Sequence, residues 1–236
     1  MNKKCLALLL LTLSLTTNAL PAAYGEVRAS DPGVTKIHVA AAQGNYWYLH
    51  FNLTSDNINL PDGTGSTPLF YAVENGQIGS TVHLIDYDAD VHARNKGGAT
   101  PLHYAVFGNS PMCFRLLIEQ GADVNALDEN KATPLHIFAS LETPQESAEE
   151  RQKELECIQI LLANGADIKL KTVFDKTVFD LAKESGRDDI TALLKKYTKK
   201  RIAALKQKLD QLEQKEQAEK QNKKQIAGEI AAYKKV

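Results

Sequence analysis

Apolar residues between positions 34 and 197 recur at helical spacing in short paired blocks rather than in one long run. In the clearest pair, Leu102 and Ala105 mark the first block, and Phe114, Leu117 and Ile118 mark the second. Spacings of three and four residues place such side chains on one face of a helix. Glycine or asparagine separates the blocks, so the pattern predicts pairs of short helices joined by tight turns.

Two strings of residues repeat along the chain with a fixed period. The string T-P-L-H occurs at 100–103 and 133–136, and T-P-L-F occurs at 67–70, so the three threonines are 33 residues apart. A second string, G-A-D followed by Val or Ile, occurs at 121–124 and 165–168. A fixed period of this length indicates stacked structural units rather than a single globular core.

These two strings and their period closely resemble the ankyrin repeat, over about residues 34–197. The resemblance implies an all-α solenoid of helix-turn-helix units with β-turn fingers, followed here by a long C-terminal helix. We expect about five units in an ankyrin repeat domain at 26–197, with the first and last degenerate. In the family, the histidine of T-P-L-H helps to hold the turn that enters the first helix. That role is implied for His38, His103 and His136.

Two units depart from the repeat in ways that matter for binding and for backbone geometry. The first unit, at 34–65, lacks the proline, and its second helix is unusually aromatic, with Tyr46, Trp47, Tyr48 and Phe51 around Leu49. These aromatic residues either cap the stack or form a sticky partner site. In the second unit, Asp88 occupies the helix-exit position of Gly121 and Gly165. We expect a left-handed backbone there, so Asp88→Gly should be neutral or stabilising.

The fourth unit contains an insertion of 11 residues around 140–150, because Thr177 lies 44 residues after Thr133. The string T-P-Q-E at 143–146 is a capping box with proline at the first helical position. Apolar residues follow at helical spacing from Leu155. We therefore predict a longer second helix at about 144–163, whose charged start is either a solvated extension or an interaction knob.

Residues 1–25 have the pattern of a signal peptide. Lys3 and Lys4 precede an apolar run at 6–15, and cleavage is expected after Ala19 or Gly25. The run is shorter than the ~20 residues that a membrane-spanning helix needs. An uncleaved anchor or a buried helix is the alternative interpretation. The pattern predicts an exported protein, periplasmic or secreted, with no membrane span in the mature chain.

Residues 198–236 form a charged tail without proline. Ile202, Leu205, Leu209 and Leu212 follow the a and d positions of a heptad repeat, but the same frame continues with polar residues at 216, 219 and 223. Three interpretations remain open. The tail pairs as a coiled-coil homodimer, extends the last helix alone, or docks elsewhere.

Charge is unevenly distributed, although the net charge is only −1. Residues 26–194 contain 13 basic and 24 acidic residues, whereas residues 195–236 contain 13 basic and 5 acidic residues. The acidic body favours a basic or polar protein surface as partner. The tail mixes both signs and has few aromatic residues, so nucleic acid is not expected to bind. Binding of the tail to an anionic surface is a minor alternative.

The sequence shows no pattern of catalytic, metal-binding or cofactor-binding residues. The three family histidines are one repeat apart, about 10 Å, and cannot share an ion whose ligands lie near 2 Å. There is no phosphate-binding glycine loop and no nucleophile elbow. Cys113 and Cys157 occupy equivalent positions in successive units, beyond disulfide reach, so we predict buried free thiols rather than a redox pair. We expect no enzymatic activity and no cofactor.

The resemblance implies a non-catalytic scaffold that binds a protein partner through the concave face and the β-turn fingers. The alternatives are a self-assembling structural protein dimerised by the C-terminal coiled coil, and a host-directed secreted effector. The fingers are expected at 92–97, 126–130 and 170–175. The predicted partner-binding residues are Arg94, Asn95, Lys96, Asp128, Glu129, Asn130 and Phe174.

Overall fold

The computed structural model describes residues 33–141 and 147–233, which form ten helices and no strand. The predicted leader at 1–25 and the predicted capping box at 143–146 lie outside the described residues. The chain divides into two units, one ending at Thr191 and one beginning at Ala192. The helices are α2 (Lys36–Ala42), α3 (Tyr46–Asn52), α4 (Pro68–Glu74), α5 (Ile78–Asp86), α6 (Pro101–Gly108), α7 (Pro111–Glu119), α8 (Pro134–Ser140), α9 (Ala148–Ala163), α10 (Val178–Glu184) and α11 (Asp188–Tyr233).

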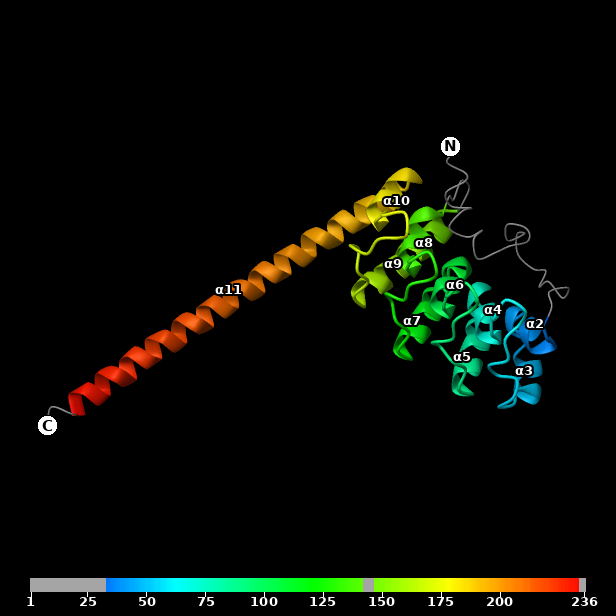
Figure 1. Cartoon of the computed structure of the whole chain (residues 1–236), viewed down its shortest axis with the longest axis horizontal. Coiled ribbons are helices and arrows are strands. Elements are labelled where there is room, and N and C mark those ends of the chain that lie inside the picture. The colour runs from blue at the N-terminus through cyan, green and yellow to red at the C-terminus, as the bar shows by residue number, and fades with distance from the viewer. Residues whose placement is uncertain (1–32, 142–146, 234–236) are drawn as a thin grey trace. The chain divides into compact units, whose positions relative to one another are not determined.

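Successive helix pairs stack side by side in the first unit, as Figure 1 shows for α2 with α3 through α8 with α9. The first helices of neighbouring repeats contact one another along the row α2, α4, α6, α8 and α10. The second helices do the same along α3, α5, α7 and α9. The fold is therefore the all-α repeat solenoid that the sequence predicted.

Each repeat opens its first helix with a threonine at the N-cap position. Thr67, Thr100 and Thr133 have extended backbones and are followed by a proline, which has no amide hydrogen to leave unpaired. Thr177 caps α10 in the same way without proline. These starts confirm the register of the repeats.

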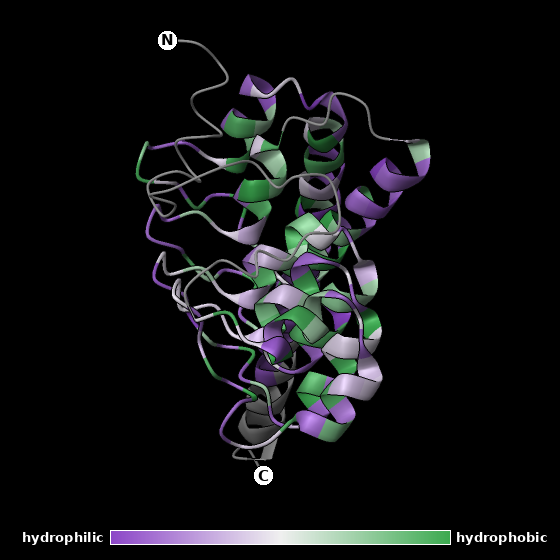
Figure 2. Cartoon of the chain, turned by 90° about the vertical axis from the view of Figure 1, so that its right-hand side faces the viewer, coloured by the Kyte–Doolittle hydropathy of each residue, from purple (hydrophilic) through white to green (hydrophobic). Residues whose placement is uncertain are grey.

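The core is one apolar layer that continues from repeat to repeat. Leu69, Leu102 and Leu135 occupy equivalent positions, and each is at most 1% exposed. Close approach of the first helices requires glycine at the end of α6, because a Cβ on Gly108 would lie 2.0 Å from the carbonyl oxygen of Val73. Figure 2 shows the apolar residues gathered on the helices and mostly polar residues on the connecting loops. Burial of this shared layer holds the stack together.

The exit of α5 confirms one sequence prediction. Asp88 has a φ of 65°, like Gly121 and Gly165 at φ 86° and 89° in the later repeats. All three residues therefore have the left-handed backbone expected after the second helix.

The start of the inserted helix corrects another prediction. We expected the helix to begin near residue 144, but α9 begins at Ala148. Ser147 and Glu150 form the capping box: the Glu150 carboxylate accepts from the Ser147 amide at 2.9 Å, and the Ser147 hydroxyl accepts from the Glu150 amide at 3.2 Å. The S-A-E-E string at 147–150 therefore supplies the capping box from which α9 starts. At 16 residues, α9 is still much longer than the 9-residue α7.

Helix α11 is continuous from Asp188 to Tyr233. The second helix of the fifth repeat and the predicted tail are thus one helix, as the interpretation of the tail as a helical extension requires. No helix in the described part of the chain is long and apolar enough to cross a membrane.

Candidate partner-binding surface

Each finger between repeats is built around one turn residue. Asp62, Asn95 and Asp128 occupy equivalent positions, and the Oδ1 atom of each accepts hydrogen bonds from the backbone amides two and four residues later, at 2.8–3.0 Å. These bonds fix the turn from within. Burial raises the pKa of Asp128 in spite of the amides that favour its charged form. Asn95 and Asp128 are half-buried, and they shape the turns that present their neighbours.

Backbone hydrogen bonds join each finger to the preceding one. The amide of Lys96 donates to Thr64 O at 2.8 Å, that of Glu129 to Gly97 O at 3.0 Å, and that of Val173 to Asn130 O at 2.9 Å. Four fingers are therefore linked into one edge. Side chains on this edge are presented from a rigid frame, which lowers the conformational entropy that the edge itself loses when a partner binds.

Histidines hold the inner ends of the fingers. The Nδ1 atom of His103 accepts from the Thr100 amide at 3.0 Å and lies 2.9 Å from the Thr100 hydroxyl, and Nε2 lies 3.1 Å from Ala132 O of the next repeat. His38 and His136 make the equivalent contacts with Ser66 O and Leu170 O. An imidazole that accepts at Nδ1 and donates at Nε2 is neutral. These contacts confirm the structural role implied for the three histidines, because each ring holds the turn that enters the first helix.

Burial lowers the pKa of all three histidines. For His103 the pKa falls to about 4, although the hydrogen bond to Ala132 favours the charged form. The finger row is therefore built on imidazoles that stay neutral in the fold. Protonation of His103 would remove the acceptor that the Thr100 amide needs.

The structure places the predicted contact residues in three different situations. Arg94 is exposed, but its guanidinium donates to Gly98 O and Leu127 O, both at 2.8 Å. Lys96 is exposed and donates to Gly63 O at 2.7 Å. Asn130 is buried. Glu129 and Phe174 are exposed at the fingertips, so of the seven predicted residues these two best fit direct contact with a partner.

Two apolar residues at the fingertips were missed by the sequence analysis. Leu127 and Val173 are 37% and 48% exposed, and Phe174, which was predicted, is 38% exposed. All three lie on the last two fingers, which the hydrogen bond from Val173 to Asn130 joins. Apolar residues in tight turns, where polar residues prevail, were the available signal. Together they give an apolar fingertip patch, defined here as Leu127, Val173 and Phe174.

A second exposed aromatic surface lies on α3. Trp47 and Phe51 are 68% and 75% exposed, and their rings stack with centroids 6.2 Å apart. Leu49 is the buried residue of this helix, and Tyr46 packs on His83 of α5 with ring centroids 4.6 Å apart. Trp47 and Phe51 thus add little to the described core, which favours the interpretation of these two residues as a partner site over that of a cap.

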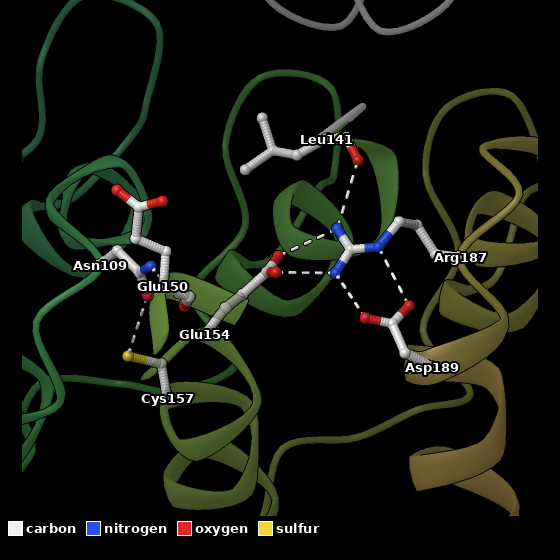
Figure 3. Close-up of polar contacts among 7 residues, drawn as sticks. All are labelled: Asn109, Leu141, Glu150, Glu154, Cys157, Arg187 and Asp189. Atoms are coloured by element: carbon white, nitrogen blue, oxygen red, sulfur yellow. Dashed lines mark hydrogen bonds and ion pairs between the residues drawn. The ribbon is translucent and has the colours of Figure 1, made fainter. Parts of the chain in front are cut away.

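A buried charged cluster ties the fourth repeat to the fifth (Figure 3). The guanidinium of Arg187 donates to both carboxylate oxygens of Glu154, at 3.0 and 2.7 Å, and to both of Asp189, at 3.1 Å each. It also donates to Leu141 O at 3.3 Å. Arg187 and Glu154 are 5% and 3% exposed. Burial disfavours the charged guanidinium, but the hydrogen bonds to both carboxylates outweigh burial and raise the pKa of Arg187.

Asn109 contributes to the same region from the end of α6. Its backbone is left-handed, with a φ of 43°, and its side-chain amide donates to Glu150 O of α9 at 2.9 Å (Figure 3). The Cys157 thiol lies 3.9 Å from Asn109 Oδ1. These contacts anchor α9 to the third repeat. The contacts of Asn109, like those of Arg187, therefore hold helices together.

Possible metal ligands and two cysteines also lie among the described residues. These residues contain no group of three potential ligands that could hold a metal ion. Cys113 and Cys157 are free and buried, as predicted, and burial raises the pKa of both thiols. A thiol with a raised pKa is a poor nucleophile at neutral pH.

The fold and the finger edge define the class of protein as a helical-repeat binding solenoid. Family comparison matches residues 37–128 to ankyrin repeats (3 copies) and residues 130–173 to an ankyrin repeat. These matches span more than half of the chain, which belongs to the ankyrin-repeat family. Members of this family are generally non-catalytic modules for protein–protein interaction. A comparison with curated proteins found no match.

Proposed function

We propose that the protein is an exported, non-catalytic scaffold, periplasmic or secreted, that binds a protein partner along its finger edge and concave face. The observation that supports this most directly is the apolar fingertip patch on a hydrogen-bonded row of fingers. Rigid aromatic and aliphatic side chains next to a charged rim are typical of the centre of an interface.

The charge around the patch favours a particular kind of partner. Glu129 is exposed beside the patch, and the body as a whole carries 24 acidic against 13 basic residues over 26–194. The nearby cations of Arg94 and Lys96 are engaged with backbone carbonyls. A partner segment with an apolar side chain next to Lys or Arg would match both features, with steering by the acidic body.

A comparison of wild type with one double variant tests the binding surface. Full-length wild type and the Val173→Ala/Phe174→Ala variant are used to capture partners from the exported fraction of the native source. The captured partner is then titrated against each protein, and we expect the double variant to bind at least about tenfold more weakly, since buried aromatic anchors dominate interface energies.

The matched control removes apolar surface from another place. Met112→Ala changes a residue that is 49% exposed and lies on α7, the second helix of its repeat, rather than on a finger. Its affinity for the partner should equal that of wild type. Equal losses in the control and in the fingertip variant would show that the fingers are not the binding surface.

The export proposal has a separate test. The chain, with its first 25 residues intact, is expressed in a bacterial host, and the mature protein is recovered from the exported fraction. N-terminal sequencing should find a start at Leu20 or Glu26, following Ala19 or Gly25. Recovery of the intact chain from the cytoplasm alone would overturn the proposed address without affecting the binding surface.

A further inference from the structure

Helix α11 carries a stripe of exposed apolar side chains. Ile202, Leu205, Leu209 and Leu212 are each 50–55% exposed. Their spacing of three, four and three residues places them on one face of the helix, at the a and d positions of two heptads. An exposed row of four large aliphatic side chains is a surface for another helix rather than for water.

The positions that flank this stripe are almost uniformly basic. In the same heptad frame the e and g positions are Lys199, Arg201, Lys206, Lys208, Glu213 and Lys215. Five of these six residues are basic, and all six are exposed. Flanking charges of this kind decide which helix can pair with the stripe.

A second copy of the chain is a poor occupant for this stripe. A parallel pair would place Arg201 beside Lys206 of the second copy and Lys215 beside Lys220 of the second copy, against one favourable contact of Lys208 with Glu213. An antiparallel pair would bring the g positions together, and all three of them are basic. The stripe spans only two heptads, which is too short to outweigh such repulsion.

An anionic membrane is also a poor occupant. The stripe is two residues wide, and acidic residues at Asp210, Glu213 and Glu216 interrupt the basic ones. Glu216 forms an ion pair with Lys220 at 2.6 Å, which neutralises part of the basic charge within the helix itself. Helices that lie in a bilayer surface have a broad apolar face and a uniformly basic polar face.

We propose that residues 199–215 of α11 bind an amphipathic helix of another protein, with apolar residues in its seam and acidic residues at its flanks. Such a partner covers Ile202, Leu205, Leu209 and Leu212 and places a carboxylate beside each of the five basic flanking residues. This interaction is separate from the proposed binding at the fingers. It gives the protein two attachment points, one for each partner.

Two synthetic peptides of equal length test this proposal. Both carry Ile and Leu at their a and d positions; one has Glu at every e and g position, and the other has Lys. Binding to the full-length chain is measured by fluorescence anisotropy. We expect the acidic peptide to bind at least about tenfold more tightly than the basic peptide, with an affinity that falls as salt is added.

Variants of the full-length chain locate the binding to the stripe. Leu205→Ser/Leu209→Ser should abolish binding of the acidic peptide, whereas Gln207→Ala/Gln214→Ala, on the opposite face of the same helix, should leave it unchanged. Lys206→Glu/Lys208→Glu/Lys215→Glu should invert the preference toward the basic peptide. Circular dichroism checks that α11 keeps its helicity in each variant, and Val173→Ala/Phe174→Ala should bind the acidic peptide as wild type does.

Three outcomes would overturn the proposal. The first is equal affinity for both peptides, or no binding of the acidic one. The second is a dimer of the full-length chain in light scattering that Leu205→Ser/Leu209→Ser dissociates, which assigns the stripe to a second copy. The third is tighter binding to vesicles of anionic phospholipid than to the acidic peptide, which assigns the stripe to a membrane surface.

Discussion

The junction between repeats three and four and the junction between repeats four and five bury different polar groups. At the first junction the neutral imidazole of His103 spans from Thr100 to Ala132 O. The second junction keeps the equivalent histidine, His136, and adds the charged cluster of Arg187 with Glu154 and Asp189. The extra cluster lies where the insertion lengthens α9.

This difference shows what an insertion demands of a repeat stack. Glu154 belongs to the buried face of α9, three and four residues before Cys157 and Ile158, so lengthening the helix brought a carboxylate into the interior. A buried carboxylate is tolerated only when it is paired and hydrogen-bonded. Arg187, in the turn before α11, pairs with this carboxylate. Its guanidinium also donates a hydrogen bond to Leu141 O at the end of α8. Regular junctions need no charge, whereas the altered junction depends on one.

The strongest test of this comparison removes the central cation. Arg187→Met should lower the free energy of unfolding by about 3–5 kcal/mol, because it leaves Glu154 buried without its partner. Urea denaturation measures the loss, and hydrogen exchange should show it in α9 and α10 before α4 and α6. Arg115→Met is the matched control, since the Arg115–Glu156 pair is 51% and 45% exposed and should cost no more than about 1 kcal/mol. Equal losses of unfolding free energy in the two variants would show that the junction between repeats four and five does not depend on its buried charges.

The regular junction should respond to pH instead. The pKa of His103 is about 4 in the fold and about 6.5 in the unfolded chain, so the unfolded state binds the proton more tightly. The stability that the neutral ring contributes is present above pH 6.5 and is lost as the pH falls toward 4. Linkage gives a loss of about 3 kcal/mol over that window.

Denaturation midpoints measured between pH 7 and pH 4 test this expectation. Wild type and the His92→Asn control, which changes an exposed histidine, should lose stability alike. His103→Asn should start from a lower stability and show a shallower dependence on pH. Parallel curves for His103→Asn and wild type would show that this imidazole does not set the response.

A third junction sharpens the comparison, because repeat two has Phe70 where repeats one, three and four have histidine. Phe70 packs edge-on against Tyr104, and the buried Thr67 hydroxyl is left without a hydrogen-bond partner. Thr67→Val should therefore stabilise the fold by about 1 kcal/mol, whereas Thr100→Val, which removes the bond to His103, should destabilise it by a similar amount. Thermal melts of the two variants should move in opposite directions, and shifts of the same sign would contradict the proposed role of histidine.

The smallest effect is expected at the helix exits. Asp88→Gly should be neutral or should raise stability by up to about 1 kcal/mol, since Asp88 has a φ of 65° and an exposed side chain. Gly121→Asp places aspartate in the same left-handed position of the next repeat, at a φ of 86°, and should cost a similar amount. A stability loss in thermal melts of Asp88→Gly would contradict the assigned register.

The repeats could be predicted from sequence because their signals are local. The threonines at 67, 100 and 133 and the glycines at 121 and 165 each act on a backbone within a few residues, so a fixed period suffices to place them. The start of α9 was predicted four residues too early because two capping strings follow one another, and the residue that caps α9 is Ser147 of the second string. The sequence alone does not show which of two similar capping strings begins the helix.

The candidate sites were predicted less completely because they depend on contacts between distant residues. Glu154 and Arg187 are 33 residues apart, and no sequence motif near Arg187 indicates that the two side chains pair. The signal that was available was a carboxylate on the apolar face of α9, which must have a partner. At the fingers, Arg94 and Lys96 were expected to contact a partner, but the carbonyls that engage their cations belong in part to neighbouring fingers.

The two buried thiols give the molecule a pair of built-in probes. Cys113 lies in the third repeat, before the neutral junction, and Cys157 lies in the fourth repeat on α9, between the neutral junction and the charged one. A buried thiol is modified only when its surroundings open. The rate at which a reagent labels each cysteine therefore reports how often the repeat that contains it unfolds locally. One unmodified chain can thus record, residue by residue, whether opening spreads across the stack or stops at the lengthened helix.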